Sequence, residues 1–344
     1  AGTGGMLATA KSYIRQLNTG ATVRLFGQEV LPETFGIGRA DMLIRQEDSD
    51  YFVKVDTLKD PDPFPDTKMS FVIANPPFGQ AWGGKDADDG VEDAVKKDHQ
   101  LFDKTEGRQG RFVATPGTGD AQLLFHLHAL AKLEENGRAA IISNGSPLFS
   151  GGTSSGESQI RRYILENDLL EAIVALPGQF FYNTGIGIYI WIYNKNKSPE
   201  RQNKVQFIDA TEEFVPLRKS LGQKRRELSQ DNIRQILRWY DDFQENDHVK
   251  IFENQEFLYR EFTVMQPLQR RGQISEETIE KAKSVPFLAK LFDEYKYQEL
   301  LEMEPRSAKD EKKLQDFVAG KTKQEAILTA LAKGSSDKTY PNFE

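Results

Sequence analysis

Four consecutive residues, Asn75-Pro76-Pro77-Phe78, have the types and the order needed to hold a planar amino group. The two prolines have no backbone N–H, and each forces the residue before it into an extended conformation. The side-chain oxygen of Asn75 and the carbonyl of Pro76 can therefore both accept hydrogen bonds from one exocyclic NH2 group. The ring of Phe78 can stack on the heterocycle that carries this group. The alternative is a strand that merely ends at a proline turn.

Apolar segments of strand length alternate with helical patterns over the first 210 residues, which indicates an open α/β sheet. The segment from Met69 to Ala74, directly before the proline turn, predicts a buried strand. The other predicted strands cover residues 22–26, 51–55, 138–143, 169–176 and 187–193, with an added edge strand at 205–209. Helices are predicted up to residue 17 and at residues 32–44, 120–135 and 157–167.

A glycine-rich segment, Ala1-Gly2-Thr3-Gly4-Gly5, stands directly before the first predicted helix. Glycines in this position let a ligand approach the backbone and the helix N-terminus, although many such loops are only turns. A strand normally leads into a loop of this kind, and none precedes it here. We therefore expect the sequence to be a fragment of a longer chain.

Acidic residues stand where the first two predicted strands end. Glu29 follows the strand at 22–26, and a carboxylate at that point of a nucleotide-binding unit commonly holds ribose hydroxyls. The segment Asp56-Thr57-Leu58 follows the strand at 51–55, where the aspartate can accept a hydrogen bond from an adenine amino group or can cap the next turn. Ligands of open α/β sheets bind beyond the carboxyl ends of the strands, so these features and Asn75 define one candidate site.

Two loops could contribute to this site. The polar segment from Gln80 to Gly119 could be a lid or a substrate-facing loop, and its basic residues could contact phosphates or simply be solvated. These basic residues are Lys96, Lys97, Lys104, Arg108 and Arg111. The aromatic-polar loop at residues 180–185 could pack beside a flipped base or could supply core aromatic side chains.

Composition narrows the possible chemistry. The 344 residues include no cysteine, which excludes disulfides, cysteine–metal sites and a cysteine nucleophile. We assign no metal ligand, because His126 and His128 point apart on one predicted helix. No apolar run could span a membrane, and we expect a cytoplasmic location. With a net charge of −7, a nucleic-acid substrate would have to be gripped by local basic patches or by another subunit.

The remainder of the chain is more highly charged. Helical patterns at residues 217–228, 232–240 and 276–301 predict a region that mediates subunit interactions or is merely solvated. We therefore divide the chain into a catalytic domain, residues 1–210, and a mainly helical C-terminal region, residues 211–344.

Several motifs follow one another in the order found in one enzyme family. They lie at residues 1–7, 26–29, 56–58, 75–79, 120–125, 144–149, 156–162, 175–177 and 181–186. Over residues 1 to about 209, the chain closely resembles the modification (M, HsdM) subunit of type I restriction–modification systems, which are N6-adenine DNA methyltransferases. It departs from this family in three ways: the Asp-Pro pair that usually precedes the glycine loop is absent, the N-terminal helical domain is absent, and Leu31 stands where asparagine is usual.

The resemblance implies a Rossmann-like class I methyltransferase sheet and S-adenosylmethionine-dependent methylation of adenine N6 in double-stranded DNA. It implies that residues 1–5 line the methionine and ribose of the cofactor, and that Glu29 binds the ribose hydroxyls. Residues 56–58 would bind the cofactor adenine, and residues 75–78 would hold the flipped target adenine. The implied partners are a specificity (S) subunit, a second M subunit and restriction (R) subunits.

Two other interpretations remain open. An enzyme that methylates cytosine N4 or a protein glutamine could use the same Asn-Pro-Pro turn, although tyrosine usually follows the prolines in those enzymes. A truncated, catalytically weak chain could also serve only as an assembly scaffold. No recognition domain is visible, so the sequence does not give a DNA target.

Overall fold

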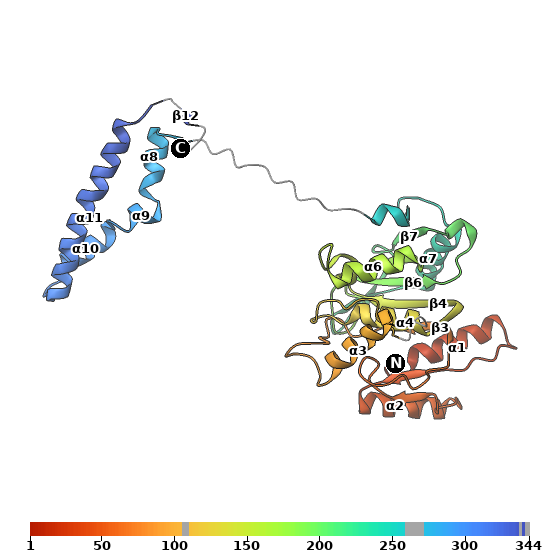
Figure 1. Ribbon diagram of the computed structural model, residues 1–344. Coiled ribbons are helices and arrows are strands. Elements are labelled where there is room, and N and C mark those ends of the chain that lie inside the picture. The colour runs from red at the N-terminus through yellow and green to blue at the C-terminus, as the bar shows by residue number, and fades with distance from the viewer. Residues whose placement is uncertain (105–109, 259–271, 337–338, 341–344) are drawn as a thin grey trace. The chain divides into compact units, whose positions relative to one another are not determined.

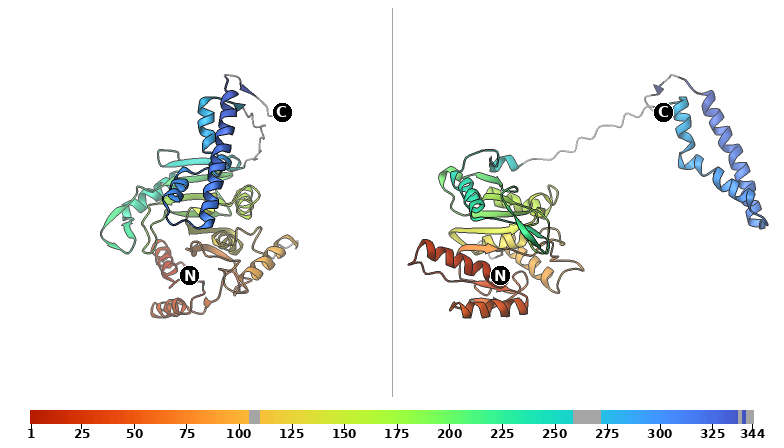
Figure 2. Two further views of the ribbon diagram at one scale, coloured as in Figure 1. Left: turned by 90° about the vertical axis from the view of Figure 1, so that its left-hand side faces the viewer. Right: turned by 180° about the vertical axis from the view of Figure 1, so that it is seen from behind.

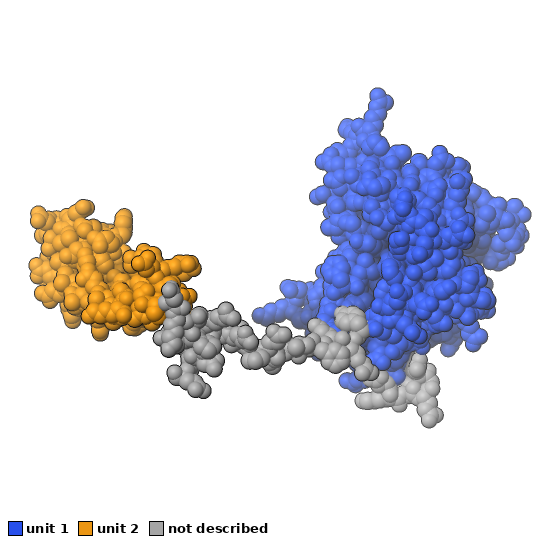
Figure 3. Space-filling model, turned by 90° about the horizontal axis from the view of Figure 1, so that it is seen from above, with its two compact units in different colours: residues 1–261 blue, residues 262–344 orange. Residues whose placement is uncertain are grey.

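The computed structural model (Figure 1) describes residues 1–104, 110–258, 272–336 and 339–340. The chain forms two compact units, residues 1–261 and residues 262–344 (Figure 3). The first unit therefore extends beyond residue 210, where the sequence suggested a boundary. It does so because strand β10 (Val249–Glu253) pairs with β7 (Lys204–Asp209). The predicted place of β7 at the sheet edge is wrong, since β10 lies outside it.

A six-stranded mixed sheet with the order β10–β7–β5–β6–β4–β3 forms the centre of the first unit. The pairs β3–β4 and β5–β7 are parallel, whereas β6 runs antiparallel to both of its neighbours. These strands confirm the predicted α/β sheet, with ends within a few residues of those expected except at the start of β4. The bounds of the four remaining strands are β3 Met69–Ala74, β4 Leu133–Ser143, β5 Leu170–Leu176 and β6 Ile188–Asn194.

Helices cover both faces of this sheet. Adjacent residues of β5 point to opposite faces, so that Ile173 packs into the larger core and Val174 into the smaller one. The larger core contains side chains from α3, α4 and α6, and the smaller core contains side chains from α7. The helix bounds are α3 Val91–Lys104, α4 Gln122–Lys132, α6 Gly156–Glu166 and α7 Gln230–Asp242.

Strand β3 is less buried than its apolar sequence predicted. It forms one edge of the six-stranded sheet, so that only β4 pairs with it. As a result, Ser70 and Phe71 are exposed, the latter to 67%. The prediction of a buried strand is therefore wrong, although the predicted ends of this strand are confirmed.

A second, two-stranded parallel sheet pairs β1 (Gly27–Glu29) with β2 (Phe52–Lys54). Helices α1 (Gly5–Leu17) and α2 (Pro32–Ile44) accompany it, and Leu25, Met42 and Phe52 form its core. The strand predicted at residues 22–26 is wrong: these residues are irregular and the strand follows them. Leu25 lies in the core of this small sheet, but only residues 27–29 pair with β2.

Several elements of the first unit were not predicted, β10 among them. Helix α3 lies within the segment interpreted as a loop, where Val91 and Val95 bury one apolar face. An antiparallel hairpin of β8 (Val215–Leu221) and β9 (Lys224–Glu227) replaces the helix predicted at residues 217–228. The short elements of this unit are α5 Ser146–Phe149, η1 Pro199–Arg201 and η2 Asn254–Phe257.

The second unit is mainly helical, as expected for its charged sequence. The backbone of Gly320 in its longest helix lies so close to the carbonyl oxygen of Leu291 that a side chain would not fit. No helix in the described part of the chain is both long enough and apolar enough to cross a membrane. The elements are α8 Glu276–Lys283, α9 Pro286–Ala289, α10 Glu294–Glu302, α11 Ala308–Lys333 and the two-residue strands β11 Gly272–Gln273 and β12 Thr339–Tyr340.

Candidate active site

The proline turn lies at the carboxyl end of β3, beside the end of β4. The pairing of Ala74 with Ile141 places Asn75 next to the last residues of β4. Pro76 is buried, whereas Asn75 and Pro77 are exposed. Among the residues that the structure describes, none forms a hydrogen bond with the Asn75 amide or with the Pro76 carbonyl. Both acceptors are therefore unpaired within the described part of the protein.

An aromatic loop between β5 and β6 lies against this turn. The ring centroids of Phe78 and Phe181 are 6.4 Å apart with an angle of 57° between the planes, and Phe180 makes an edge contact with Phe181 at 5.8 Å. All three rings are half-buried on the smaller core, while Tyr182 is 60% exposed. The loop thus supplies core aromatic side chains and also contacts the proline turn.

A buried glutamine fixes the segments beside the turn. Gln122 is fully buried, and its Nε2 donates to both carboxylate oxygens of Asp120 (3.0 and 2.8 Å) and to Oδ1 of Asn144 (3.0 Å). Its Oε1 accepts from the backbone N–H of Asn144 at 3.1 Å. The N–H of Ala121 donates to the carbonyl of Gln80, just after the turn. The sequence analysis gave Asp120, Gln122 and Asn144 no role. Their polar side chains at the start of a predicted helix and the end of a predicted strand were the feature that could have indicated one.

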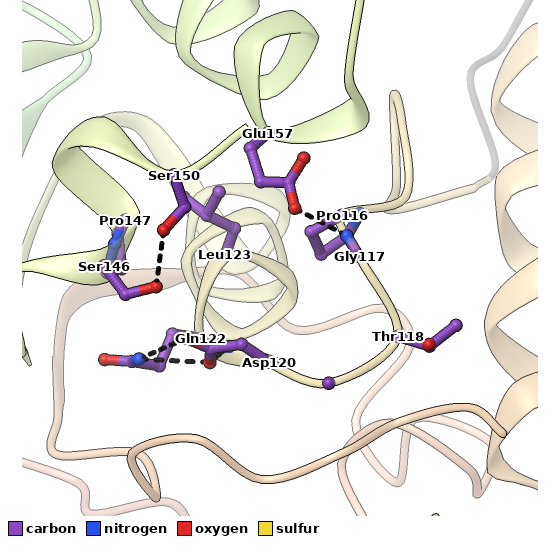
Figure 4. Close-up of a pocket in the computed structure, with 11 residues that line it drawn as sticks. Pro116, Gly117, Thr118, Asp120, Gln122, Leu123, Ser146, Pro147, Ser150 and Glu157 are labelled. Atoms are coloured by element: carbon purple, nitrogen blue, oxygen red, sulfur yellow. Dashed lines mark hydrogen bonds between the residues drawn. The ribbon is translucent and has the colours of Figure 1, made fainter. Parts of the chain in front are cut away.

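A cavity of about 250 Å³ opens beside this glutamine (Figure 4). Glu157, near the start of α6, accepts from the N–H of Gly117 at 2.7 Å, and the hydroxyls of Ser146 and Ser150 are 2.8 Å apart. Burial opposes ionisation of Glu157, but this N–H and its other donors outweigh burial and lower its pKa. The cavity is therefore lined by an ionised carboxylate, that of Glu157, and by the hydroxyls of Ser146 and Ser150, which can form hydrogen bonds. Its lining residues are Pro116, Gly117, Thr118, Gly119, Asp120, Gln122, Leu123, Ser146, Pro147, Ser150 and Glu157.

Glu29, at the end of β1, connects the two-stranded β1–β2 sheet with the glycine loop. Its Oε2 accepts from the N–H of Gly2 at 2.7 Å, while Oε1 accepts from the N–H of Leu31 at 3.0 Å. Burial disfavours its charge, but these donors outweigh burial and lower the pKa of Glu29. The carboxylate is therefore ionised at neutral pH. Among the described residues, Oε1 has one partner and can accept a further hydrogen bond.

The glycine loop is held against the small sheet. Gly4 has a φ of +77°, which is unfavourable for residues with a side chain, and it precedes the first residue of α1. A β-carbon at Gly4 would lie 3.3 Å from Met42 and 3.7 Å from Phe52. Thr3 and Gly5 are exposed on either side of it. This packing fixes the path of the loop next to Glu29.

The segment after β2 has a partly structural role. Oδ1 of Asp56 accepts from the N–H of Leu58 at 2.9 Å, so the aspartate caps the turn as one of the two interpretations predicted. The hydroxyl of Thr57 donates to the side chain of Gln28 at 3.0 Å, which joins the ends of β1 and β2. The side chain of Leu58 lies in the main core, so that only its backbone can face a ligand.

Two of the basic residues suggested as phosphate contacts are engaged within the protein. Lys96 pairs with Glu92 at 2.5 Å. Arg111 pairs with Asp98 at 2.5 Å, and its Nη1 donates to the carbonyl of Thr57 at 2.7 Å. Arg108 and the side chain of Lys104 lie outside the described residues. Arg111 therefore supports the turn after β2 instead of extending toward solvent.

The predicted site residues thus form two groups. Hydrogen bonds join the glycine loop, Glu29 and residues 56–58 at the carboxyl end of the two-stranded sheet. Residues 75–78 end β3 in the six-stranded sheet, together with the Gln122 network and the aromatic loop.

Comparison with known proteins identifies DNA methylases as the relatives of this chain. A sequence model of the N-6 DNA methylase family matches residues 1–265. The HindI methylase subunit of a type I restriction enzyme from Haemophilus influenzae is 33% identical over 214 residues, which are 61% of this chain and 43% of that protein. The MjaIX methylase subunit from Methanocaldococcus jannaschii is 27% identical over 239 residues, which are 69% of this chain and 39% of that protein.

A solved structure shows the same fold. The methyltransferase subunit of a type I restriction–modification system from Streptococcus thermophilus has a TM-score of 0.60 and 26% sequence identity, covering 74% of this chain and 49% of that one. The mixed sheet with helices on both faces thus has the α/β fold of a methyltransferase subunit, which confirms the predicted methyltransferase sheet. Since the family match covers most of the sequence, the chain belongs to the N-6 DNA methylase family. The chain spans about two fifths of the length of these two curated relatives.

Proposed function

We propose that this chain acts as the modification (M) subunit of a type I restriction–modification system and transfers a methyl group from S-adenosylmethionine to N6 of adenine in double-stranded DNA. One observation carries the proposal. The Asn75 amide and the Pro76 carbonyl are two neighbouring acceptors without partners among the described residues, and Phe78 stands beside them. The two curated relatives, which are methylase subunits, support the same reaction.

The proline turn acts on the nucleophile. The lone pair of the adenine amino nitrogen is delocalised into the ring, which makes this nitrogen a weak nucleophile. Hydrogen bonds from its two N–H groups to Asn75 and Pro76 favour a more tetrahedral nitrogen with an available lone pair, and Phe78 holds the ring by stacking. Pro77 keeps the preceding carbonyl extended. The base must leave the duplex to reach the turn, at a cost of about a few kcal/mol.

The first group of residues fits the cofactor. When bound, S-adenosylmethionine supplies an electrophilic methyl group on a sulfonium. Glu29 would hold the ribose hydroxyls, because its ionised carboxylate retains acceptor capacity. Residues 1–5 would line the methionine and ribose. Asp56 would use Oδ2 for the adenine amino group, since Oδ1 caps the turn, while Thr57 and Leu58 shape the rest of that pocket.

We further propose that the chain works in the cytoplasm with other subunits. A specificity (S) subunit would read the DNA sequence, and a second M subunit and restriction (R) subunits would complete the assembly. The names of the relatives as subunits of type I restriction enzymes support this arrangement. The charged helices of residues 262–344 are the candidate surface for such contacts.

The test compares Asn75→Ala with wild type. Unmethylated DNA is incubated with protein and S-adenosylmethionine, and the methylated nucleosides are identified by mass spectrometry. Wild type should form N6-methyladenine, and the variant should be slower by about 10²- to 10³-fold with an unchanged melting temperature, because Asn75 is exposed. Asn136→Ala, at another exposed position, is the control. Wild-type turnover by Asn75→Ala would refute the role of this residue, and a product methylated at cytosine N4 or protein glutamine would refute the assigned substrate.

A further inference from the structure

The β8–β9 hairpin is a local concentration of positive charge in an acidic protein. Residues 215–227 contain five basic residues and one acidic residue, whereas the whole chain has a net charge of −7. Of the five, Arg218, Lys219 and Arg225 are exposed, and Lys224 and Arg226 are half-buried. The hairpin extends outward from the first unit as the green-to-teal ribbon in the left view of Figure 2.

Among the described residues, these cations form no ion pairs. Within the described ranges, none of the five contacts a carboxylate, in contrast to Arg111 and Arg162, which pair with Asp98 and Glu166. Lys224 and Arg226 contact aromatic rings instead. The Nζ of Lys224 lies 5.3 Å from the ring centroid of Tyr182, and the guanidinium of Arg226 lies 4.1 Å from that of Phe214. The positive charge of the hairpin is therefore available to an anionic partner.

The hairpin is attached to the aromatic loop of the candidate active site. The N–H groups of Gln223 and Arg225 donate to the carbonyls of Tyr182 (2.8 Å) and Gln179 (2.9 Å). Gly222, at the tip, has a φ of +60°, and a β-carbon there would lie 2.5 Å from the carbonyl oxygen of Tyr182. Only glycine allows this close approach. The position of the hairpin relative to the loop is thus fixed by backbone contacts.

The same loop contacts the proline turn. Phe181 in the loop lies 6.4 Å from Phe78, so a continuous set of contacts leads from the proposed base-holding turn to the basic hairpin. DNA affinity comes largely from cations that neutralise phosphates, and such contacts fix the position of a protein on the duplex. In an acidic protein, a basic patch near the active site is where such phosphate contacts can be made.

We propose that the β8–β9 hairpin binds the DNA backbone, with its cations on phosphates close to the flipped adenine. This inference rests on the proposed function, because it uses the position of the proline turn as the site of the base. The exposed cations Arg218, Lys219 and Arg225 make the phosphate contacts. Lys224 and Arg226 hold the hairpin on its aromatic supports and add to the positive field.

The test measures binding of the full 344-residue chain to a fluorescent duplex at several salt concentrations. The variant combines Arg218→Gln, Lys219→Gln and Arg225→Gln, which are exposed changes that should not affect folding. The control combines Arg45→Gln, Arg162→Gln and Arg234→Gln, which removes the same charge from positions paired with nearby carboxylates. Each lost phosphate contact should reduce affinity about five- to tenfold at low salt and lower the salt slope by about 0.9.

Further readouts separate this proposal from the proposed function. The hairpin variant should raise the KM for DNA with little change in kcat, and its affinity for S-adenosylmethionine should equal that of wild type. If wild type methylates DNA and both variants show the wild-type salt slope, the hairpin proposal is wrong and the proposed function stands. If the hairpin variant keeps the slope but loses a co-purifying protein subunit, the cations serve that protein, and the DNA proposal is wrong. Wild type that neither binds nor methylates DNA would overturn both proposals.

Discussion

The rings of Phe78 and Phe181 lie 6.4 Å apart, although the two residues belong to loops at the ends of different strands. Phe78 follows β3 and Phe181 follows β5, which is separated from β3 in the sheet by β4 and β6. The contact brings the aromatic loop to the proline turn and connects that turn to the smaller core. Phe181 thus supports the ring that we propose to stack on the target base.

Replacing Phe181 tests this support. Phe181→Ala should lower kcat/KM for DNA about tenfold or more, since a small displacement of a positioning group can cost up to about 10²-fold. Phe181→Tyr should retain most of the activity, because the ring is preserved. Phe287→Ala, at a 68% exposed position in the second unit, is the control for loss of a phenyl ring. Steady-state kinetics together with melting temperatures are the measurement, and equal kcat/KM for Phe181→Ala and wild type would contradict the prediction.

Glu29→Gln should weaken S-adenosylmethionine binding. The ionised carboxylate accepts N–H groups on both oxygens and retains an acceptor for ribose, whereas an amide offers one oxygen and no charge. Hydrogen bonds to charged groups contribute about 1.5–3 kcal/mol, so the Kd should rise about tenfold to 150-fold. Isothermal titration measures the Kd, with the exposed Glu33→Gln as the matched control. An unchanged Kd for Glu29→Gln would remove this residue from the cofactor site.

Gln122→Ala should destabilise the first unit. The change empties the fully buried position of the Gln122 side chain and removes the side-chain partner of the half-buried Asn144 N–H and Asp120 carboxylate. An unsatisfied buried group costs about 1–3 kcal/mol, and urea denaturation should show a loss in this range or above it. Gln100→Ala, on the exposed side of α3, should change the free energy of unfolding by less than about 0.5 kcal/mol. If the two variants were equally stable, the network would not hold the site together.

Stability should fall below about pH 6.5 because of His126. This residue is fully buried between the Tyr193 hydroxyl (2.6 Å) and the Ser143 hydroxyl (2.7 Å), and burial lowers its pKa from 6.5 to about 3. Between these values the unfolded chain binds a proton that the native protein does not bind. The free energy of unfolding therefore decreases by up to about 1.4 kcal/mol per pH unit as the pH is lowered.

Urea titrations at pH 7.5 and pH 5.0 check this effect. His126→Gln removes the titrating group, so the variant should lose about 2 kcal/mol less than wild type between the two pH values. The His126→Gln protein will be less stable at every pH, but only the difference between the two pH values tests the prediction. An identical pH dependence in the two proteins would show that His126 does not remain neutral in the folded state.

The sequence alone determined the elements whose signals are local. An apolar run that ends at two prolines gave the bounds of β3 and the proline turn, and Pro32 at the start of a helical pattern gave the bounds of α2. The order of glycine loop, Glu29, Asp56 and Asn75 also predicted the fold, because each feature depends only on residues near it in the chain. The sequence placed these features in one candidate site, whereas the structure divides them between two sheets.

Tertiary structure decided the features that depend on distant partners. Residues 217–228 carry charges with helical spacing, yet they form a hairpin, because the left-handed turn at Gly222 fits against the carbonyl of Tyr182. Arg111 could have faced phosphates, but Asp98 and the carbonyl of Thr57 bind it. Strand pairing likewise placed β7 inside the sheet. Hydrogen-bond partners far apart in the chain leave no periodic signal in the sequence, so only the folded chain reveals them.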